Sequence, residues 1–360
     1  MTIPAFSTDL KYRYPARYRA SWGALALLVV VASFLASSVL TGRSLQLVSA
    51  LAGILALAAL GQMLIIMLGA IDLSVPATIA AAAGVTVHYA DSGTLGVVVG
   101  ALAVAVAISL INGVLISGLH LNSVIVTLAT YAIVSGAIQV WTGVAFSNSG
   151  QAPAALQDFA GRAVLSLNMC FLIAIAIGAL LVVVLTHTRA GRRVARVGDN
   201  ARAARAQGIN LRAVELSTFA GAGLLYGLAG VLIAAFIATP DISVGSPYQL
   251  ASITVVAIAG ASFSGGPASI SSVLCASVFL TMLDQTLTVQ GLSAGARVIA
   301  QGVALVVAIA VITVGQYATA SAWRLLRHVR GSRALPAGEH AFAQVVHSSS
   351  DDEAGREAPL

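Results

Sequence analysis

Charge is scarce in this sequence: only 9% of its 360 residues are Asp, Glu, Lys or Arg, whereas 58% are hydrophobic. A soluble domain carries about 25% charged residues, so this chain lacks the charge that a water-exposed surface needs. Most of its surface must therefore face lipid, where only helices and closed barrels satisfy their backbone polar groups. Because the apolar runs show no alternation with a period of two, we predict an all-α, polytopic membrane protein.

Other absences exclude classes of site. Lys11 is the single lysine, so the chain cannot contain the G-x-x-x-x-G-K-[ST] phosphate-binding loop of an ATPase. It also has no His, Cys and carboxylate cluster at metal-ligand spacing. The two cysteines, Cys170 and Cys275, lie inside apolar runs, and we expect them to be free and inert. We therefore expect no enzyme activity, cofactor or metal in this chain.

What the sequence has in abundance is apolar runs of the length that a membrane crossing requires. A spanning helix needs roughly 20 apolar residues, and turn residues separate the runs found here. The third and eighth runs are short for a full crossing. The hydropathy pattern predicts about ten transmembrane helices, at 22–40, 46–69, 75–90, 95–117, 123–143, 164–186, 214–238, 249–263, 269–288 and 295–316.

Basic residues gather in three clusters, at 11–19, 189–212 and 324–333. In a soluble protein the net charge of +6 would suggest a nucleic-acid partner. Here the clusters flank apolar runs, as Lys and Arg do on the cytoplasmic side of membrane proteins, so we expect no nucleic-acid partner. An even number of predicted spans separates each cluster from the next. The three clusters therefore share one side, which predicts that both termini are cytoplasmic.

The domain organisation follows from these signals. We assign a cytoplasmic N-terminal arm to 1–20, the membrane body to 21–320 and a cytoplasmic tail to 321–360. The tail is rich in serine and acidic residues, and we expect it to be disordered because it cannot bury a core. The run at 22–40 also resembles a signal peptide, but more spans follow at once, so we expect it to be retained.

Polar residues within the apolar runs are the candidates for a substrate pathway, because ionisable groups at membrane depth are usually functional. In the segment Ile71 to Pro76, Ser74 suits a helix N-cap and Pro76 a first turn, so a helix should start there. A helix that starts within the membrane would present free N–H groups to a ligand. A plain capped turn is an equally good interpretation. Hydroxyl groups at the start of the fifth span more often bond the backbone than a substrate. Near the span ends, Glu215 and Arg297 can simply face water. We assign to the pathway Asp72, Ser74, Asn122, Thr127, Asp284 and Gln285.

The segment 187–213 is long enough to form short helices on the cytoplasmic face. Residues 198–200 are typical of a turn and cap, and 201–207 of a short helix that Gly208 ends. Such a helix suits a partner protein, although the segment could also be a solvated basic loop that only sets topology. The hairpin at 260–269 is predicted to be a tight turn whose glycines permit positive φ. Docking residues are assigned to Asn200, Arg202, Ala203, Ala204 and Gly208.

Together these segments resemble the ABC transporter permeases of the ribose, xylose and arabinose type. Residues 61–75 are similar to that family's G-M-T-x-V-I…G-G-I-D-L-S-V-G segment, and 121–130 to its V-P-P-F-I-A-T-L-G-T segment. Residues 188–210 resemble T-R-F-G-R…A-V-G-G-N-E-x-A-A-R-x-x-G-I-N, and 260–266 resemble G-G-T-S-L-x-G-G. The chain departs from the pattern at Arg202, where the family has Glu. The resemblance extends over about 40–320, nearly the whole membrane body.

The resemblance implies the permease subunit of a binding-protein-dependent sugar importer in the bacterial inner membrane. Its partners would be a cytoplasmic ABC ATPase that docks on 187–213 and holds ATP and Mg²⁺, a periplasmic sugar-binding protein, and a second permease copy or paralogue within the lipid bilayer. Related permeases carry branched-chain amino acids or nucleosides. An ion-coupled secondary transporter, with Asp72 and Asp284 as its carboxylates, is the alternative from another class, and a membrane enzyme or scaffold is a third.

Overall fold

A computed structural model describes residues 16–143, 150–307 and 310. Most of the predicted N-terminal arm, the end of the tenth span and the tail at 321–360 lie outside these residues. The described elements are α2 (Ala16–Leu35), η1 (Ser37–Leu40), α3 (Gly42–Met67), α4 (Val75–His88), η2 (Ala90–Ser92), α5 (Thr94–Leu119), α6 (Ser123–Thr142), α7 (Ala154–Gly161), β1 (Ala163–Val164), β2 (Leu167–Asn168), α8 (Met169–His187), α9 (Arg189–Asp199), α10 (Ala201–Ala206), α11 (Leu211–Ile237), α12 (Pro247–Ile258) and α13 (Ile270–Val289), followed by an apolar helix at Ala294–Val307.

The apolar helices match the predicted spans one for one, which confirms an all-α, polytopic membrane protein. Among the described residues, α3, α5, α6, α8, α11 and α13 are long and apolar enough to cross a membrane. Four apolar helices are shorter: Ala20–Leu35 within α2, α4, α12 and Ala294–Val307. The sequence predicted two of these short helices, α4 and α12. Ten complete crossings therefore stay a prediction.

Three helices, α3, α4 and α11, form the centre of the bundle, and most of their side chains are buried. By contrast, α5, α6 and α8 leave most of their apolar side chains at least partly exposed, as lipid-facing helices do. Gly223 and Gly227 let α11 approach α5 closely, because a Cβ on either would be 2.8 Å from atoms of α5. This confirms the helix-packing role that their four-residue spacing indicates.

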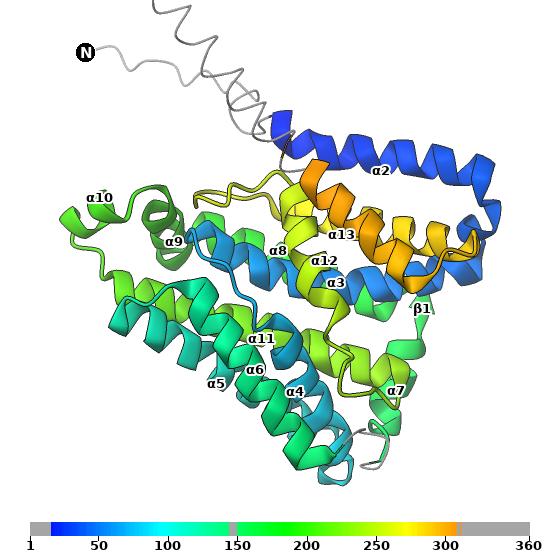
Figure 1. Cartoon of the computed structure of the whole chain (residues 1–360), viewed down its shortest axis with the longest axis horizontal. Coiled ribbons are helices and arrows are strands. Elements are labelled where there is room, and N and C mark those ends of the chain that lie inside the picture. Colours follow the sequence, from blue (N-terminus) through cyan, green and yellow to red (C-terminus); the bar gives the residue numbers. More distant parts are fainter. Residues whose placement is uncertain (1–15, 144–149, 308–309, 311–360) are drawn as a thin grey trace, which may run out of the picture. The chain divides into compact units, whose positions relative to one another are not determined.

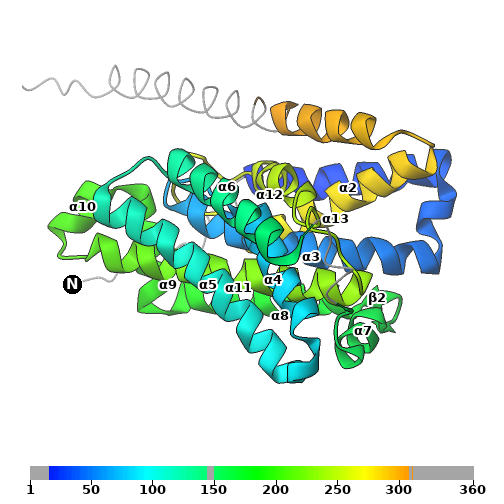
Figure 2. The ribbon, with the colours of Figure 1, turned by 60° about the horizontal axis from the view of Figure 1, so that its bottom comes forward.

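Hydrogen bonds join distant segments at both ends of the bundle. At one end, the Gly266 N–H donates to the carbonyl oxygen of Met67. At the other end, the Ala152 N–H donates to the carbonyl oxygen of Ala238. In both ribbon views α9 and α10 lie at one end of the bundle and α7 with the short hairpin at the other (Figure 1, Figure 2). The assignment of the α9 and α10 end to the cytoplasm stays a prediction.

The structure shows where the sixth span begins and how the segment 187–213 folds. The sixth span, predicted from residue 164, begins only at Met169, because 163–168 form the antiparallel pair β1–β2. Its start is fixed by Asn168, whose Oδ1 accepts a hydrogen bond from the Cys170 N–H at 2.8 Å. The segment 187–213 contains the short helices that its length predicted, α9 and α10.

Candidate functional site

The turn before α4 is built around the buried carboxyl group of Asp72. Its Oδ1 accepts hydrogen bonds from the Ser74 N–H at 2.8 Å and from the Ser74 hydroxyl at 2.6 Å. Ser74 stands at the N-cap position of α4 as predicted, but its side chain makes no cap hydrogen bond. The prediction of a serine side-chain cap is therefore wrong in detail: Asp72 shapes the turn, and Ser74 is free to bond elsewhere.

A chain of side-chain hydrogen bonds runs from this turn to α5 and α6. Asn112 of α5 donates from Nδ2 to the Ser74 hydroxyl at 2.9 Å, and its Oδ1 accepts from the Thr130 hydroxyl at 2.6 Å. The Leu73 N–H donates to the Thr127 hydroxyl at 2.9 Å. We call Asp72, Ser74, Asn112, Thr127 and Thr130 the polar network. It holds the start of α4 against two peripheral helices. In a membrane the hydrophobic effect does not drive helices together, and hydrogen bonds between them contribute to association.

On its inner side the turn meets the amide of Gln62 from α3. With its nitrogen towards Asp72, the Gln62 amide donates to the Asp72 carbonyl oxygen at 3.1 Å and accepts from the Asp72 N–H at 3.3 Å. Among the described residues, Asp72 Oδ2 has no hydrogen-bond partner, and the whole residue is 1% exposed. The arrangement makes Asp72 a buried organiser of the turn.

A small cavity lies beside the network, on the first two turns of α4. Its volume is about 130 Å³, and its walls come from α4, from α6 and from the segment between α11 and α12. The lining residues are Pro76, Ala77, Ala80, Tyr131, Ser135, Gln139, Ile242, Ser243 and Ser246.

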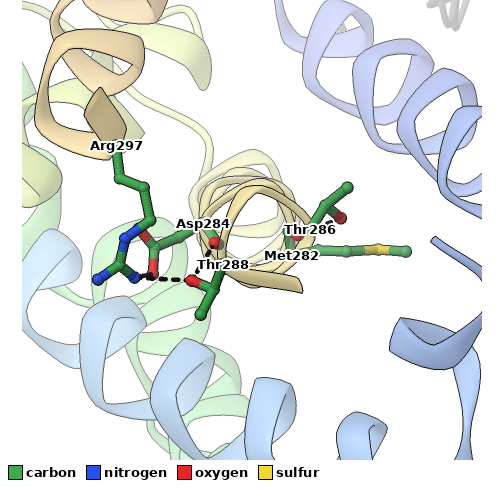
Figure 3. Close-up of polar contacts among 5 residues, drawn as sticks. All are labelled: Met282, Asp284, Thr286, Thr288 and Arg297. Carbon is green, nitrogen blue, oxygen red and sulfur yellow. Dashed lines mark hydrogen bonds and ion pairs between the residues drawn. The ribbon is translucent and has the colours of Figure 1, made fainter. Parts of the chain in front are cut away.

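The other predicted pathway residues lie apart from the network. Asn122 is exposed and caps α6, accepting from the Val124 N–H at 2.9 Å. Arg297 does not simply face water, because its Nη1 lies 2.9 Å from Asp284 Oδ2 and also donates to the Thr288 hydroxyl at 2.7 Å (Figure 3). Asp284 borders a second cavity of about 460 Å³. Gln285, next to it on α13, is half-buried and does not line either cavity.

The predicted docking segment forms two short helices. Asn200 caps α10 as expected, since its Oδ1 accepts from the Ala203 N–H at 3.0 Å. Gly208, at φ +78°, follows the last turn of α10 and ends it. Ala204 is buried against the protein, whereas Arg202 and Ala203 are exposed. The exposed side of the segment also carries Arg189, Arg192, Arg193, Arg196, Arg205 and Arg212.

The end of α9 touches the backbone of two other segments at a glycine junction, formed by Gly198, Gly265, Gly266 and Met67. A Cβ on Gly198 would lie 1.9 Å from the Met67 carbonyl oxygen, which already accepts from the Gly266 N–H at 3.0 Å. A Cβ on Gly265 would lie 2.6 Å from the Gly198 carbonyl oxygen. Gly198 is therefore a close-approach position inside α9, and the predicted turn at 198–200 is wrong there. Positive φ at Gly265 and Gly266 is confirmed.

Sequence reasoning thus found Asp72, Ser74 and Thr127 of the polar network but did not select Asn112. It also missed the polar face of α6 at Tyr131, Ser135 and Gln139. The available signal was that these three polar residues follow one another at intervals of four in an otherwise apolar run, which places them on one face of a helix.

Comparison with known proteins places the chain among transport permeases. Residues 44–314 match the family described as "Branched-chain amino acid transport system / permease component". The chain is 28% identical over 301 residues to the ribose import permease protein RbsC of Escherichia coli (strain K12), covering 80% of this chain and 91% of that protein. It is 30% identical over 254 residues to the autoinducer 2 import system permease protein LsrC of Enterobacter sp. (strain 638), covering 69% of this chain and 72% of that one. No solved structure matches. The chain belongs to the branched-chain amino acid transport system permease family.

Proposed function

We propose that this chain is the membrane-spanning subunit of an ATP-driven importer that carries a sugar or related polyol delivered by a periplasmic binding protein. The similarity to a ribose import permease along 80% of the chain is the observation that supports a sugar as the substrate. The polar network and the neighbouring cavity supply hydroxyl and amide groups near the centre of the bundle. In this reading the subunit provides a path and releases its solute readily, since tight binding would stop transport.

Energy would come from a partner, because the sequence has no phosphate-binding loop of its own. The exposed side of α9 and α10 is the surface that we assign to the cytoplasmic ATPase, which would hold ATP and Mg²⁺. A second permease, either identical or related, would complete the path in the bacterial inner membrane. Both termini would face the cytoplasm, on the same side as α9 and α10.

The experiment is uptake into proteoliposomes that contain this chain together with its partner ATPase and binding protein. Radiolabelled ribose and radiolabelled leucine are compared, with ATP inside the vesicles or with a proton gradient alone. We expect ribose uptake that requires ATP and the binding protein. Uptake of leucine instead would favour the branched-chain amino acid alternative, which the family's description suggests. Uptake driven by the gradient without the ATPase would indicate an ion-coupled transporter.

Docking of the ATPase is predicted to depend on the exposed side of α10. Ala203→Asp places a carboxylate on this side, beside Arg202, and is expected to reduce co-purification of the ATPase about tenfold at unchanged membrane insertion, a loss of about 1.4 kcal/mol in binding. Ala204→Asp is the matched comparison. It buries an unpaired charge within the permease itself and should lower the amount of folded protein. Full complex formation by Ala203→Asp would mean that α10 is not the docking surface.

A further inference from the structure

The cavity beside the polar network lies between three parts of the chain that only the fold brings together. One wall is the start of α4, and another is a face of α6. The third is 242–246, which leads into α12 and presses directly on α4: a Cβ on Gly245 would lie 1.9 Å from the Pro76 carbonyl oxygen. The segment between α11 and α12 therefore turns inward and reaches the level at which α4 begins.

The α6 wall carries polar side chains, although most of α6 is apolar. Tyr131, Ser135 and Gln139 are four residues apart, so they share one face of the helix. In the part of the chain that the structure describes, none of these three side chains has a hydrogen bond to another protein group. Polar groups at membrane depth are costly unless they meet protein partners or water, so this face is built for something other than lipid.

The chemistry of the lining selects a class of solute. Its polar groups are hydroxyls and an amide, which both donate and accept hydrogen bonds, and its other members are apolar. No lining residue carries a charge at neutral pH, and the carboxylate of Asp241, which adjoins the lining, already accepts hydrogen bonds from the Ser243 N–H and hydroxyl at 2.6 Å each. An amino acid has two charges that would need ionic partners in such a place, whereas a sugar needs only hydroxyl and amide groups. The volume of about 130 Å³ is also well above the roughly 15 Å³ that one water requires.

We propose that this cavity is a water-filled section of the translocation path, in which a neutral, polyhydroxylated solute is bonded by Tyr131, Ser135, Gln139 and Ser246. The proposal rests on the proposed function as a sugar importer and deepens it, because it assigns the side chains that contact the solute. The Asp72 network then has a defined task, which is to hold the α4 wall of the path against α5 and α6.

The test uses single cysteines in a chain whose Cys170 and Cys275 are replaced by alanine. Ser135→Cys places a thiol in the cavity wall, and Ala137→Cys places one on the exposed outer side of α6 at nearly the same depth. Both are treated with the charged, water-soluble thiol reagent MTSET in the assembled importer. We expect Ser135→Cys to react at least about tenfold faster than Ala137→Cys, and ribose to slow its reaction. After modification, Ser135→Cys should lose most ATP-driven ribose uptake while Ala137→Cys keeps it.

Equal reaction rates at the two positions would overturn the proposal, because the cavity would not be a water-filled compartment. Normal ribose uptake after complete modification of Ser135→Cys would also overturn it, since the cavity would then lie off the path. A failure of the proposed function looks different. The unmodified importer would carry leucine and not ribose, which rejects the sugar assignment, whereas the ratio of reaction rates would still support a water-filled cavity.

Discussion

Gly198→Ala is expected to lower ATP-driven uptake about tenfold, although alanine is the better helix former by about 1 kcal/mol. The new Cβ would lie 1.9 Å from the Met67 carbonyl oxygen, and backbone atoms cannot give way as a flexible side chain can. Either α9 moves or the hydrogen bond from the Gly266 N–H to Met67 is lost. Overpacking of this kind costs about 1–3 kcal/mol, and 1.4 kcal/mol corresponds to a tenfold change.

The effect matters for mechanism because Met67 ends α3 only a few residues before Asp72. We expect a displacement of α9 at the glycine junction to be passed to the turn that organises the polar network. The measurement is ribose uptake per ATP hydrolysed in proteoliposomes, at equal amounts of inserted permease. Gly118→Ala is the control. Gly118 lies at the C-terminal end of α5, and a Cβ there would meet nothing within 4 Å. If both variants transport like the unchanged chain, the junction does not couple α9 to the path.

Asp72→Ala is expected to be the more damaging of two changes at the buried carboxyl. It removes the acceptor of the Ser74 N–H and hydroxyl and leaves a buried N–H unpaired, which costs about 1–3 kcal/mol. Asp72→Asn keeps an oxygen at the same place and should retain a substantial part of the uptake. We therefore expect the order of uptake to be unchanged chain, then Asp72→Asn, then Asp72→Ala.

The measurement is initial uptake of ribose, with the amount of folded permease determined for each variant by size-exclusion chromatography. Thr130→Val tests the far end of the network, because it removes only the hydroxyl that donates to Asn112. We expect a smaller loss there than with Asp72→Ala. Equal losses in Asp72→Asn and Asp72→Ala would show that transport needs the carboxylate itself and not a hydrogen-bond acceptor, which contradicts its assignment as an organiser of the turn.

The sequence by itself determined the features that depend on neighbours along the chain. Apolar runs of membrane length and too little charge for a soluble surface predicted the helical membrane body, and the glycine spacing on α11 indicated close helix packing. The cap at Asn200 and the stop at Gly208 were equally readable, because a cap is made by hydrogen bonds within one turn. The family, too, was recognisable from local segments.

Only the tertiary structure decided which distant residues act together. Asn112 looks like an ordinary polar residue in an apolar run until α4 and α6 are placed on either side of it. Gly198 was typical of a turn, and its real constraint is the Met67 carbonyl oxygen, which no local pattern can reveal. The polar face of α6 could be recognised as a cavity wall only because the fold places 242–246 opposite it. Such contacts join segments far apart in the chain, and they are set by packing of whole helices, whereas spans and caps are set by hydrophobicity and hydrogen bonds within a few residues.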